Sequence, residues 1–504
     1  MRKWWPLFTI CLGTFMLLVD VTIVNVALPD MAVDLQTSFT SLQWVIDAYA
    51  LTLAALLLGI GSLADRFGHR RSYVIGLVTF AVASLACGLA PNANILIAAR
   101  AVQGVGAAAM FATTFALINS SYQGRDRGTA YGMWGAVSGA AAAFGPIVGG
   151  ILTQAISWRW IFFVNLPISI VAVALCFAVL ASDAGVRGPR LDLAGTAAFT
   201  MFAGTLVFAL ILTGSDGWAS PTVWVLLAIS VFSLLAFLAV ERSSSHAMLD
   251  LSLFTSRSFV GIMVAALLIN FAAFSAFTYT SLWLQSVIGL SPLQAGLTGL
   301  PLSLSAFMVS AMIGRFLHRS HPGPIIGTGM VLIGLGSGLV ALLLHDSSSW
   351  PALIPGYIII GVGVGLALPT LSSSAMSAVP IHRGGMAAGV VNTARQLGFA
   401  LGIAVLGSVF AAGARQSLNG SGAPNSSTLA DSLVAGHAHA VLAGTPPEQQ
   451  PFVEHLLRAA STHGLDLAFG LAAIIGLLAG ALVLGLVRPK PDVVATAEPA
   501  GVAA

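Results

Sequence analysis

Long runs of apolar residues, separated by short polar segments, dominate the pattern of this 504-residue chain. A helix needs about 20 apolar residues to cross the hydrocarbon core of a bilayer. Runs of about that length predict fourteen membrane-spanning helices, at 7–28, 42–62, 73–90, 94–117, 129–152, 161–181, 193–213, 221–240, 259–282, 294–314, 324–344, 352–372, 387–411 and 466–487. Most connections between these runs are short. The exception is 413–464, rich in Gly, Ser, Ala and Pro, within which "PFVEHLLRAA" predicts a short amphipathic helix.

Composition places the whole chain in a membrane. Hydrophobic residues make up 57% of the sequence and charged residues only 8%, whereas a soluble domain carries about 25% charged residues. Cys11, Cys87 and Cys176 all fall in apolar runs, so we interpret them as small buried side chains. Their spacing indicates neither a disulfide framework nor a metal site.

Basic residues predict the orientation. If the N-terminus is inside, sixteen of the 21 Lys and Arg residues fall in inner segments, and only Arg159, Arg415 and Arg458 fall in outer ones. Cytoplasmic loops are enriched in Lys and Arg, so we expect both termini to be cytoplasmic. The remaining two, Arg100 and Arg395, lie within predicted spans.

Two short similarities suggest an internal repeat. The segment "DRFGHRRS" at 65–72 is similar to "GRFLHRSH" at 314–321, and "RGTAYG" opening span five is similar to "RGGMAAG" opening span thirteen. Both pairs are offset by eight spans, which predicts two six-helix bundles with two inserted helices. Parallel half-repeats are a common design of secondary transporters. The predicted units are an N-terminal bundle (1–190), an inserted pair (191–245), a C-terminal bundle (246–490) containing the outer loop 413–464, and a cytoplasmic tail (491–504).

Three charged residues lie at similar depth in the outer half of the predicted membrane. Asp20 is in span one, Asp47 in span two and Arg100 in span four. A charged residue at the centre of a spanning helix costs about 2.5–3.5 kcal/mol on insertion scales, and such residues often mark an ion or substrate path. Matching depth predicts that the three meet in one cavity. Two simpler interpretations remain: Asp20 and Arg100 form a static ion pair, and Asp47 is an interfacial residue that reaches water.

The loop "GSLADRFGHRR" at 61–71 combines glycines with charges. Gly61 and Gly68 allow a tight turn and close helix approach, and Asp65 can pair with an arginine or a helix N-terminus. This pattern resembles the signature of the major facilitator superfamily, and the chain is most similar to its fourteen-span drug:proton antiporter branch. Further matching segments are "LLVDVTIVNVALP" in span one, "LIAARAVQGVGAA" in span four, "GAVSGAAAAFGPIVGG" in span five, "WRWIFFVNLPI" before span six and "NTARQLGFALG" in span thirteen.

The resemblance implies a role for each of these motifs. It assigns proton coupling to Asp20 and Arg100. The expected substrate cavity comprises Asp47, Asn25, Gln103, Arg395 and Asn392. For Arg395 a packing role with Asn392 and Gln396 is an equal alternative. The span-five motif, which marks antiporters, comprises Gly135, Gly139, Gly145, Pro146, Gly149 and Gly150; small residues allow close packing and the proline a kink. The gating loop comprises Gly61, Asp65, Arg66, Gly68, Arg70 and Arg71.

These features predict a transporter of the cell membrane. We expect a monomeric proton-driven antiporter, surrounded by lipid, that exports lipophilic and mainly cationic drugs or antibiotics. No cofactor, metal or nucleic acid is expected. The alternative is an exporter or permease of a specific natural metabolite, such as a secondary metabolite, an amino acid or a siderophore. An enzyme is disfavoured, because none of the ten histidines forms a spaced pair inside a span and no phosphate-binding Walker pattern is present.

Overall fold

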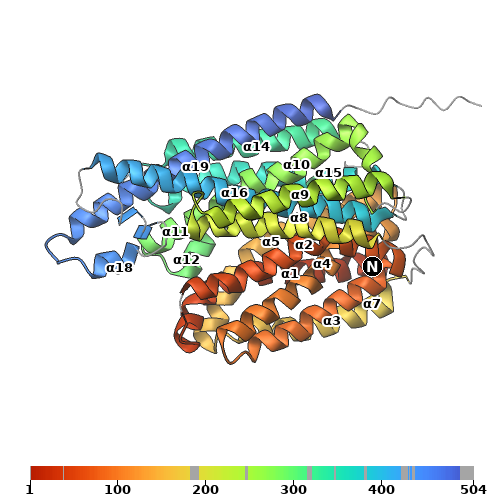
Figure 1. Ribbon diagram of the computed structural model, residues 1–504, viewed down its shortest axis with the longest axis horizontal. Helices are drawn as coiled ribbons and strands as arrows, with labels where there is room; N and C mark the ends of the chain where they lie inside the picture. Colours follow the sequence, from red (N-terminus) through yellow and green to blue (C-terminus); the bar gives the residue numbers. More distant parts are fainter. Residues whose placement is uncertain are drawn as a thin grey trace, which may run out of the picture.

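The computed structural model is a bundle of long helices lying roughly parallel to one axis (Figure 1). It describes residues 2–37, 39–181, 192–244, 248–314, 321–345, 348–379, 383–421, 429–430, 432–433 and 438–487. Thirteen helices in these ranges are long and apolar enough to cross a membrane. The remaining long helix, α5 (Gly124–Ala155), has 32 residues and is rich in glycine and alanine.

The N-terminal bundle is built from the first six predicted spans. Its helices are α1 (Trp5–Asp34), α2 (Phe39–Phe67), α3 (His69–Gly88), α4 (Ala93–Ser121), α5, and the consecutive α6 (Trp160–Phe163) and α7 (Asn165–Val179). Helix α4 packs on both α2 and α3, and α1 packs on α5 and α7. Every helix therefore has one face in the bundle interior, which is where polar side chains can be held away from lipid.

The C-terminal bundle repeats this arrangement with more interrupted helices. It contains α10 (Arg257–Phe274), α11 (Ala276–Leu282), the π-helical segment η3 (Trp283–Val287), α12 (Pro292–Leu297), α13 (Leu300–Ile313), α14 (Pro322–Leu343), α15 (Ile354–Ser377), α16 (Gly384–Gly420) and α19 (Gln450–Leu486). Helix α14 packs on α15 and α19, and α16 packs on α10 and α19. The two bundles meet where α2 and α4 contact α16 and where α5 contacts α13.

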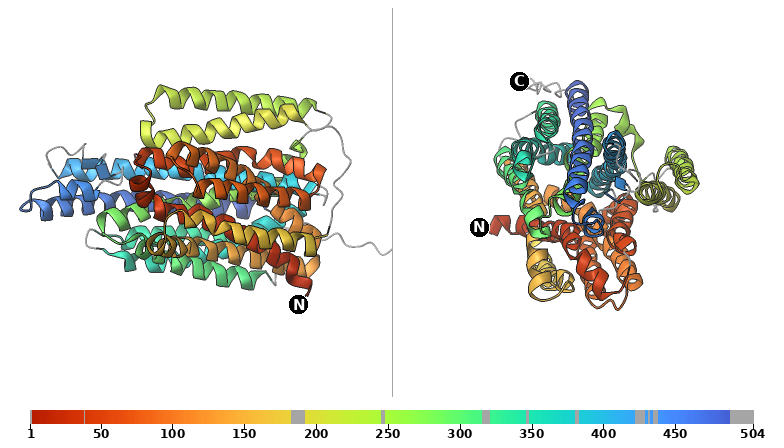
Figure 2. Two further views of the ribbon diagram at one scale, coloured as in Figure 1. Left: turned by 90° about the horizontal axis from the view of Figure 1, so that it is seen from below. Right: turned by 90° about the vertical axis from the view of Figure 1, so that its left-hand side faces the viewer.

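Two inserted helices lie beside the bundles. Helices α8 (Leu193–Asp216) and α9 (Pro221–Ser243) pack against one another, and α8 also contacts α2 and α16. Figure 2 shows this pair at one side of the molecule, with α9 farthest out. The fold is thus the predicted one: two six-helix bundles with two inserted helices.

The segment 413–464 differs from the prediction of an outer loop with one short helix. Helix α16 continues to Gly420, α18 covers Ala438–Ala443, and α19 already begins at Gln450. The helix predicted at 451–460 is the first part of α19, because its apolar residues continue the packing face of the span that follows. Phe410 and Gly464 are in contact, with the Phe410 carbonyl 2.6 Å from where a Gly464 Cβ would lie. The predicted tail, 491–504, is outside the described residues.

Candidate functional site

A fully buried polar cluster surrounds Asp20 in the N-terminal bundle. Arg100 of α4 donates from Nη1 to Asp20 Oδ2 at 2.6 Å and to Gln103 Oε1 at 2.7 Å. Asp20 Oδ1 accepts from Gln103 Nε2 at 3.1 Å and from Asn165 Nδ2 at 3.0 Å. Ser84 of α3 accepts from the same two amides, at 2.9 and 3.0 Å. Four helices, α1, α3, α4 and α7, therefore converge on one carboxylate.

Helices α2 and α6 complete the surroundings of the arginine. Arg100 Nε donates to the Val45 carbonyl at 2.9 Å, and its guanidinium lies 4.3 Å from the Tyr49 ring centroid and 5.9 Å from that of Phe162. Asp20 is 0% and Arg100 1% exposed. Removing one partner of such a buried pair typically costs about 3–5 kcal/mol, because the other charge is left without compensation. The pair predicted from depth alone is therefore present, and its cluster is linked to four other helices, α2, α3, α6 and α7.

Asn165 and Ser84 were not singled out by the sequence reasoning. Asn165 lies within the segment "WRWIFFVNLPI" that carries part of the resemblance, so a signal for it existed. Ser84 is one serine in an apolar span and offers no such signal. Gln103, which we expected in the substrate cavity, belongs to the Asp20 cluster instead and is fully buried there.

Asp47 does not join this cluster, contrary to the expected three-residue cavity. The contacts of α2 with Arg100 come from Val45 and Tyr49. At 100° per residue, Asp47 points about 160–200° away from both of them. Asp47 is partly exposed, and none of the ion pairs between described residues includes it. Asp47 has a depth similar to that of Asp20 and Arg100, but it lies on a different face of α2 from the residues that contact Arg100.

Arg395 lies at the interface of the two bundles without an acidic partner among the described ion pairs. Its Nη1 donates to Asn392 Oδ1 at 3.3 Å, its guanidinium is 6.0 Å from the Trp134 ring centroid, and its Nε is buried without a hydrogen bond. Asn392 in turn donates to the Phe111 carbonyl of α4 at 3.2 Å. These contacts join α16 to α4 and α5, so donors of one bundle face the other. Asn25 lies on α1, and its side chain is outside the described set.

The gating loop connects the two bundles at the end that holds the N-terminus. Asp65 accepts from the backbone N–H groups of Gly385 at 2.6 Å and Met386 at 2.8 Å, in the first turn of α16. A helix N-terminus stabilises such an anion through its free N–H groups and its dipole. His69 Nε2 lies 2.8 Å from the same carboxylate. Asp65 thus holds the N-terminal bundle to α16 directly.

Glycines make this contact possible. A Cβ at Gly61 would lie 2.4 Å from the Gly385 carbonyl oxygen, so only glycine fits. Gly68 has φ of 98° between α2 and α3, a conformation that other residues rarely adopt. Of the arginines in the loop, Arg70 donates to the Phe177 carbonyl at 3.3 Å, whereas Arg66 and Arg71 are exposed.

The span-five glycines lie along α5 where it packs on both neighbours. A Cβ at Gly145 would lie 1.8 Å from Thr22 Oγ1 of α1, and Gly135 and Gly139 face Ser310 and Ser303 of α13. Gly150 faces Leu293 of α12, and Gly149 is buried. Pro146 is on α5, with its side chain outside the described set. A further close approach, which the sequence reasoning missed, is at Gly132 of α5, where a Cβ would lie 2.6 Å from the Cα of Gly314, directly after α13.

This architecture defines a transporter. Residues 10–403 match the family model described as Major Facilitator Superfamily, and the chain belongs to that family. It is a multi-pass membrane transporter and not an enzyme.

Its relatives are named for drug resistance. The chain is 36% identical to the multidrug resistance protein Stp of Mycobacterium tuberculosis (strain CDC 1551 / Oshkosh) over 402 residues, covering 80% of this chain and 74% of that protein. It is 36% identical to the puromycin resistance protein pur8 of Streptomyces alboniger, covering 87% and 88%. It is 29% identical to the tetracenomycin C resistance and export protein of Streptomyces glaucescens, covering 97% and 93%. These relatives agree with the drug-efflux branch that the motifs indicated.

Solved structures share the fold. The crystal structure of the human organic anion transporter MFSD10 aligns with a TM-score of 0.61 at 15% identity, covering 95% of this chain and 99% of the other. A proton:xylose symporter, XylE, aligns with a TM-score of 0.60 at 11% identity, covering 96% of each chain.

Proposed function

We propose that this protein is a proton-driven antiporter that exports lipophilic, mainly cationic, drugs or antibiotics across the cytoplasmic membrane. The observation that carries the proposal is the buried pair of Asp20 and Arg100, because it puts a titratable carboxylate among four helices of one bundle. The resistance-protein relatives support export as the direction of transport and drugs as the substrate class.

In the proposed coupling step, a proton replaces Arg100 as the positive charge that compensates the Asp20 carboxylate. In the described arrangement the guanidinium of Arg100 compensates the Asp20 carboxylate. Helix movements that draw Arg100 away would leave the carboxylate without that charge, and uptake of a proton from the outer side would then neutralise it. Return of Arg100 would favour release of the proton to the inside, since a nearby cation favours the ionised carboxylate.

Movement of the halves would require separable contacts. The proposed moving units are 1–190 and 246–490, with the inserted pair 191–245 between them in the sequence. The Asp65 contact with α16 and the α5–α13 glycine contact both join these units. Both would have to break when the transporter opens at that end.

Substrate contacts are proposed for Arg395, Asn392 and Asp47. Arg395 has five N–H donors, and the described hydrogen bonds use one of them. The free donors suit carbonyl or other acceptor groups of a drug. A cation preference rests on Asp47, whose carboxylate has no basic partner among the described ion pairs.

The experiment for this function uses the purified protein in sealed liposomes. An acid interior should drive uptake of tetraphenylphosphonium, a lipophilic cation, through molecules inserted inside-out. Uptake should alkalinise the interior, as read by a trapped pH dye. A pH difference of one unit corresponds to about 1.4 kcal/mol per proton. If one proton exchanges for one tetraphenylphosphonium cation, this difference should support about ten-fold accumulation of that cation. Uptake without proton movement would contradict antiport.

The orientation gives a second expected result. Single cysteines are placed at Glu448, between α18 and α19, and at Gln123, between α4 and α5, both of which are exposed. The native cysteines are all buried and provide a silent background. An impermeant maleimide should label Glu448→Cys in intact cells and Gln123→Cys only after permeabilisation. The opposite labelling would place both termini outside.

A further inference from the structure

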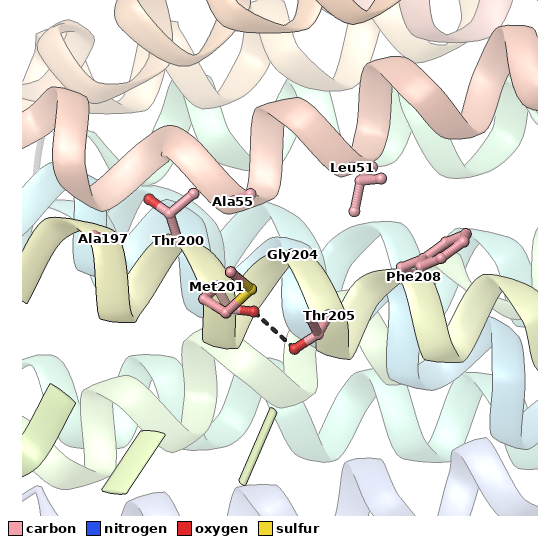
Figure 3. A pocket seen from close by; sticks show the side chains of 8 residues that line it. All are labelled: Leu51, Ala55, Ala197, Thr200, Met201, Gly204, Thr205 and Phe208. Atoms are coloured by element: carbon pink, nitrogen blue, oxygen red, sulfur yellow. Dashed lines mark hydrogen bonds between the residues drawn. The ribbon is translucent and has the colours of Figure 1, made fainter. Parts of the chain in front are cut away.

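An apolar groove runs between α2 of the N-terminal bundle and α8 of the inserted pair. Its volume is about 510 Å³, within the range of small-molecule pockets. Figure 3 shows Leu51 and Ala55 of α2 facing Thr200, Met201, Gly204 and Phe208 of α8. Thr205, which also lines it, donates to the Met201 carbonyl of its own helix at 2.7 Å, so its hydroxyl is satisfied. The walls therefore suit a hydrocarbon or aromatic body.

A carboxyl group of α2 lies one helical turn before the residues that line this groove. Asp47 is one helical turn before Leu51, so the two residues are neighbours on the surface of α2. Phe208, at the end of the groove that Leu51 also lines, contacts the Trp44 ring with centroids 5.5 Å apart. Asp47 is thus flanked along α2 by two residues, Trp44 and Leu51, that both adjoin the Phe208 end.

The carboxyl group at this end has no basic partner in the described part of the chain. Asp47 is partly exposed, and no described ion pair or hydrogen bond engages its carboxylate. The groove residues at this end, Leu51 and Phe208, are aliphatic and aromatic, and Phe208 contacts the Trp44 ring. A carboxylate next to aromatic faces is a combination that attracts organic cations, both by charge and by the ring quadrupole.

We infer that the α2–α8 groove, with Asp47 at its end, is a binding site at which lipophilic cations are taken up from the bilayer. The apolar body lies along Leu51, Ala55 and Gly204, and the cationic group lies at Asp47, beside Trp44 and Phe208. The inserted helices, which a six-plus-six bundle does not require, supply one wall. That cations bound in this groove go on to be exported rests on the proposed export function. That cations bind in the groove does not depend on it.

Binding is measured without any gradient, on the full-length protein in nanodiscs of zwitterionic phosphatidylcholine. The probes are tetraphenylphosphonium, a lipophilic cation, and N-phenyl-1-naphthylamine, a neutral lipophile. Asp47→Asn should weaken tetraphenylphosphonium binding about ten-fold through loss of the opposite charge, and should leave the neutral probe unchanged. Gly204→Leu should fill the groove and weaken both probes by about ten-fold or more, because it removes their shared apolar contact.

Gly485→Leu is the matched control, because it makes the same change on α19, outside the groove. A Cβ at Gly485 would meet no atom within 4 Å, so this variant should bind both probes as the wild type does. Unchanged tetraphenylphosphonium binding in Asp47→Asn or in Gly204→Leu would overturn the inference, as would no binding to the wild type. Loss of a co-purified phospholipid from Gly204→Leu, with unchanged probe binding, would show that the groove holds lipid and would also overturn it. If the wild type binds the cation at this site but an imposed pH gradient drives no uptake, the proposed antiport fails while the site stands.

Discussion

Replacing Asp20 with asparagine is expected to reduce gradient-driven accumulation of substrate from about ten-fold, for a pH difference of one unit, to about one. Asparagine keeps the shape of the side chain but cannot take up a proton. It also places an amide where Arg100 now meets a carboxylate oxygen at 2.6 Å. The measurement is tetraphenylphosphonium uptake into acid-interior liposomes, with the pH dye read in parallel.

Two variants act as controls for this result. Asp20→Glu keeps a titratable carboxyl group and should retain proton-coupled uptake at a reduced rate. Asp34→Asn removes a carboxylate from the same helix, at a site where Asp34 pairs with Arg159 at the exposed end of α1. The Arg159 side chain hydrogen bond holds the pKa of Asp34 below its usual value, so this group stays ionised near neutral pH and should not carry the coupled proton. Full accumulation of substrate by Asp20→Asn would contradict a coupling role of Asp20.

Replacing Arg100 is expected to separate charge from geometry. Arg100→Ala should abolish coupled uptake, because a buried carboxylate without compensation costs about 3–5 kcal/mol. Arg100→Lys keeps the charge but cannot serve Asp20, Gln103 and the Val45 carbonyl together, since it lacks the planar fork. We expect it to retain roughly a tenth of the wild-type uptake rate, corresponding to about 1.4 kcal/mol.

Arg159 provides a matched control for the Arg100 variants. Arg159→Ala removes an exposed partner of Asp34 and should change uptake little, because exposed pairs contribute about 0–1 kcal/mol. Melting curves of all variants, recorded with size-exclusion profiles, separate lost coupling from lost folding. Equal and full uptake by Arg100→Ala and Arg100→Lys would reduce Arg100 to a packing role.

The spanning helices and the Asp20–Arg100 pair could be predicted from the sequence for one physical reason. Long apolar runs have few alternatives to spanning a bilayer, and a charge inside such a run is costly enough to need a partner. Asp20 and Arg100 stand out on that ground, and their depths along the chain match. Gly61, Asp65 and Gly68 could also be singled out from the sequence, because each has a distinct backbone or electrostatic role.

Other parts of the site were not readable in the same way. Ser84 and Tyr49 are ordinary residues until α2, α3 and α4 bring them to Asp20. A helix was predicted at 451–460, but its continuity with the span that follows was not, because α19 packs against α16 through long-range contacts.

The sequence by itself determined the membrane-spanning class of this protein, the order of its helices and the charges buried within them, because the cost of exposing polar groups to hydrocarbon depends on local composition. Only the tertiary structure decided which helix faces meet. A spanning helix is apolar toward lipid and toward its neighbours alike, so its pattern does not distinguish the two. That is why Asp47, predicted beside Asp20, lies on a different face of α2 from Val45 and Tyr49, while Asn165 completes the Asp20 cluster.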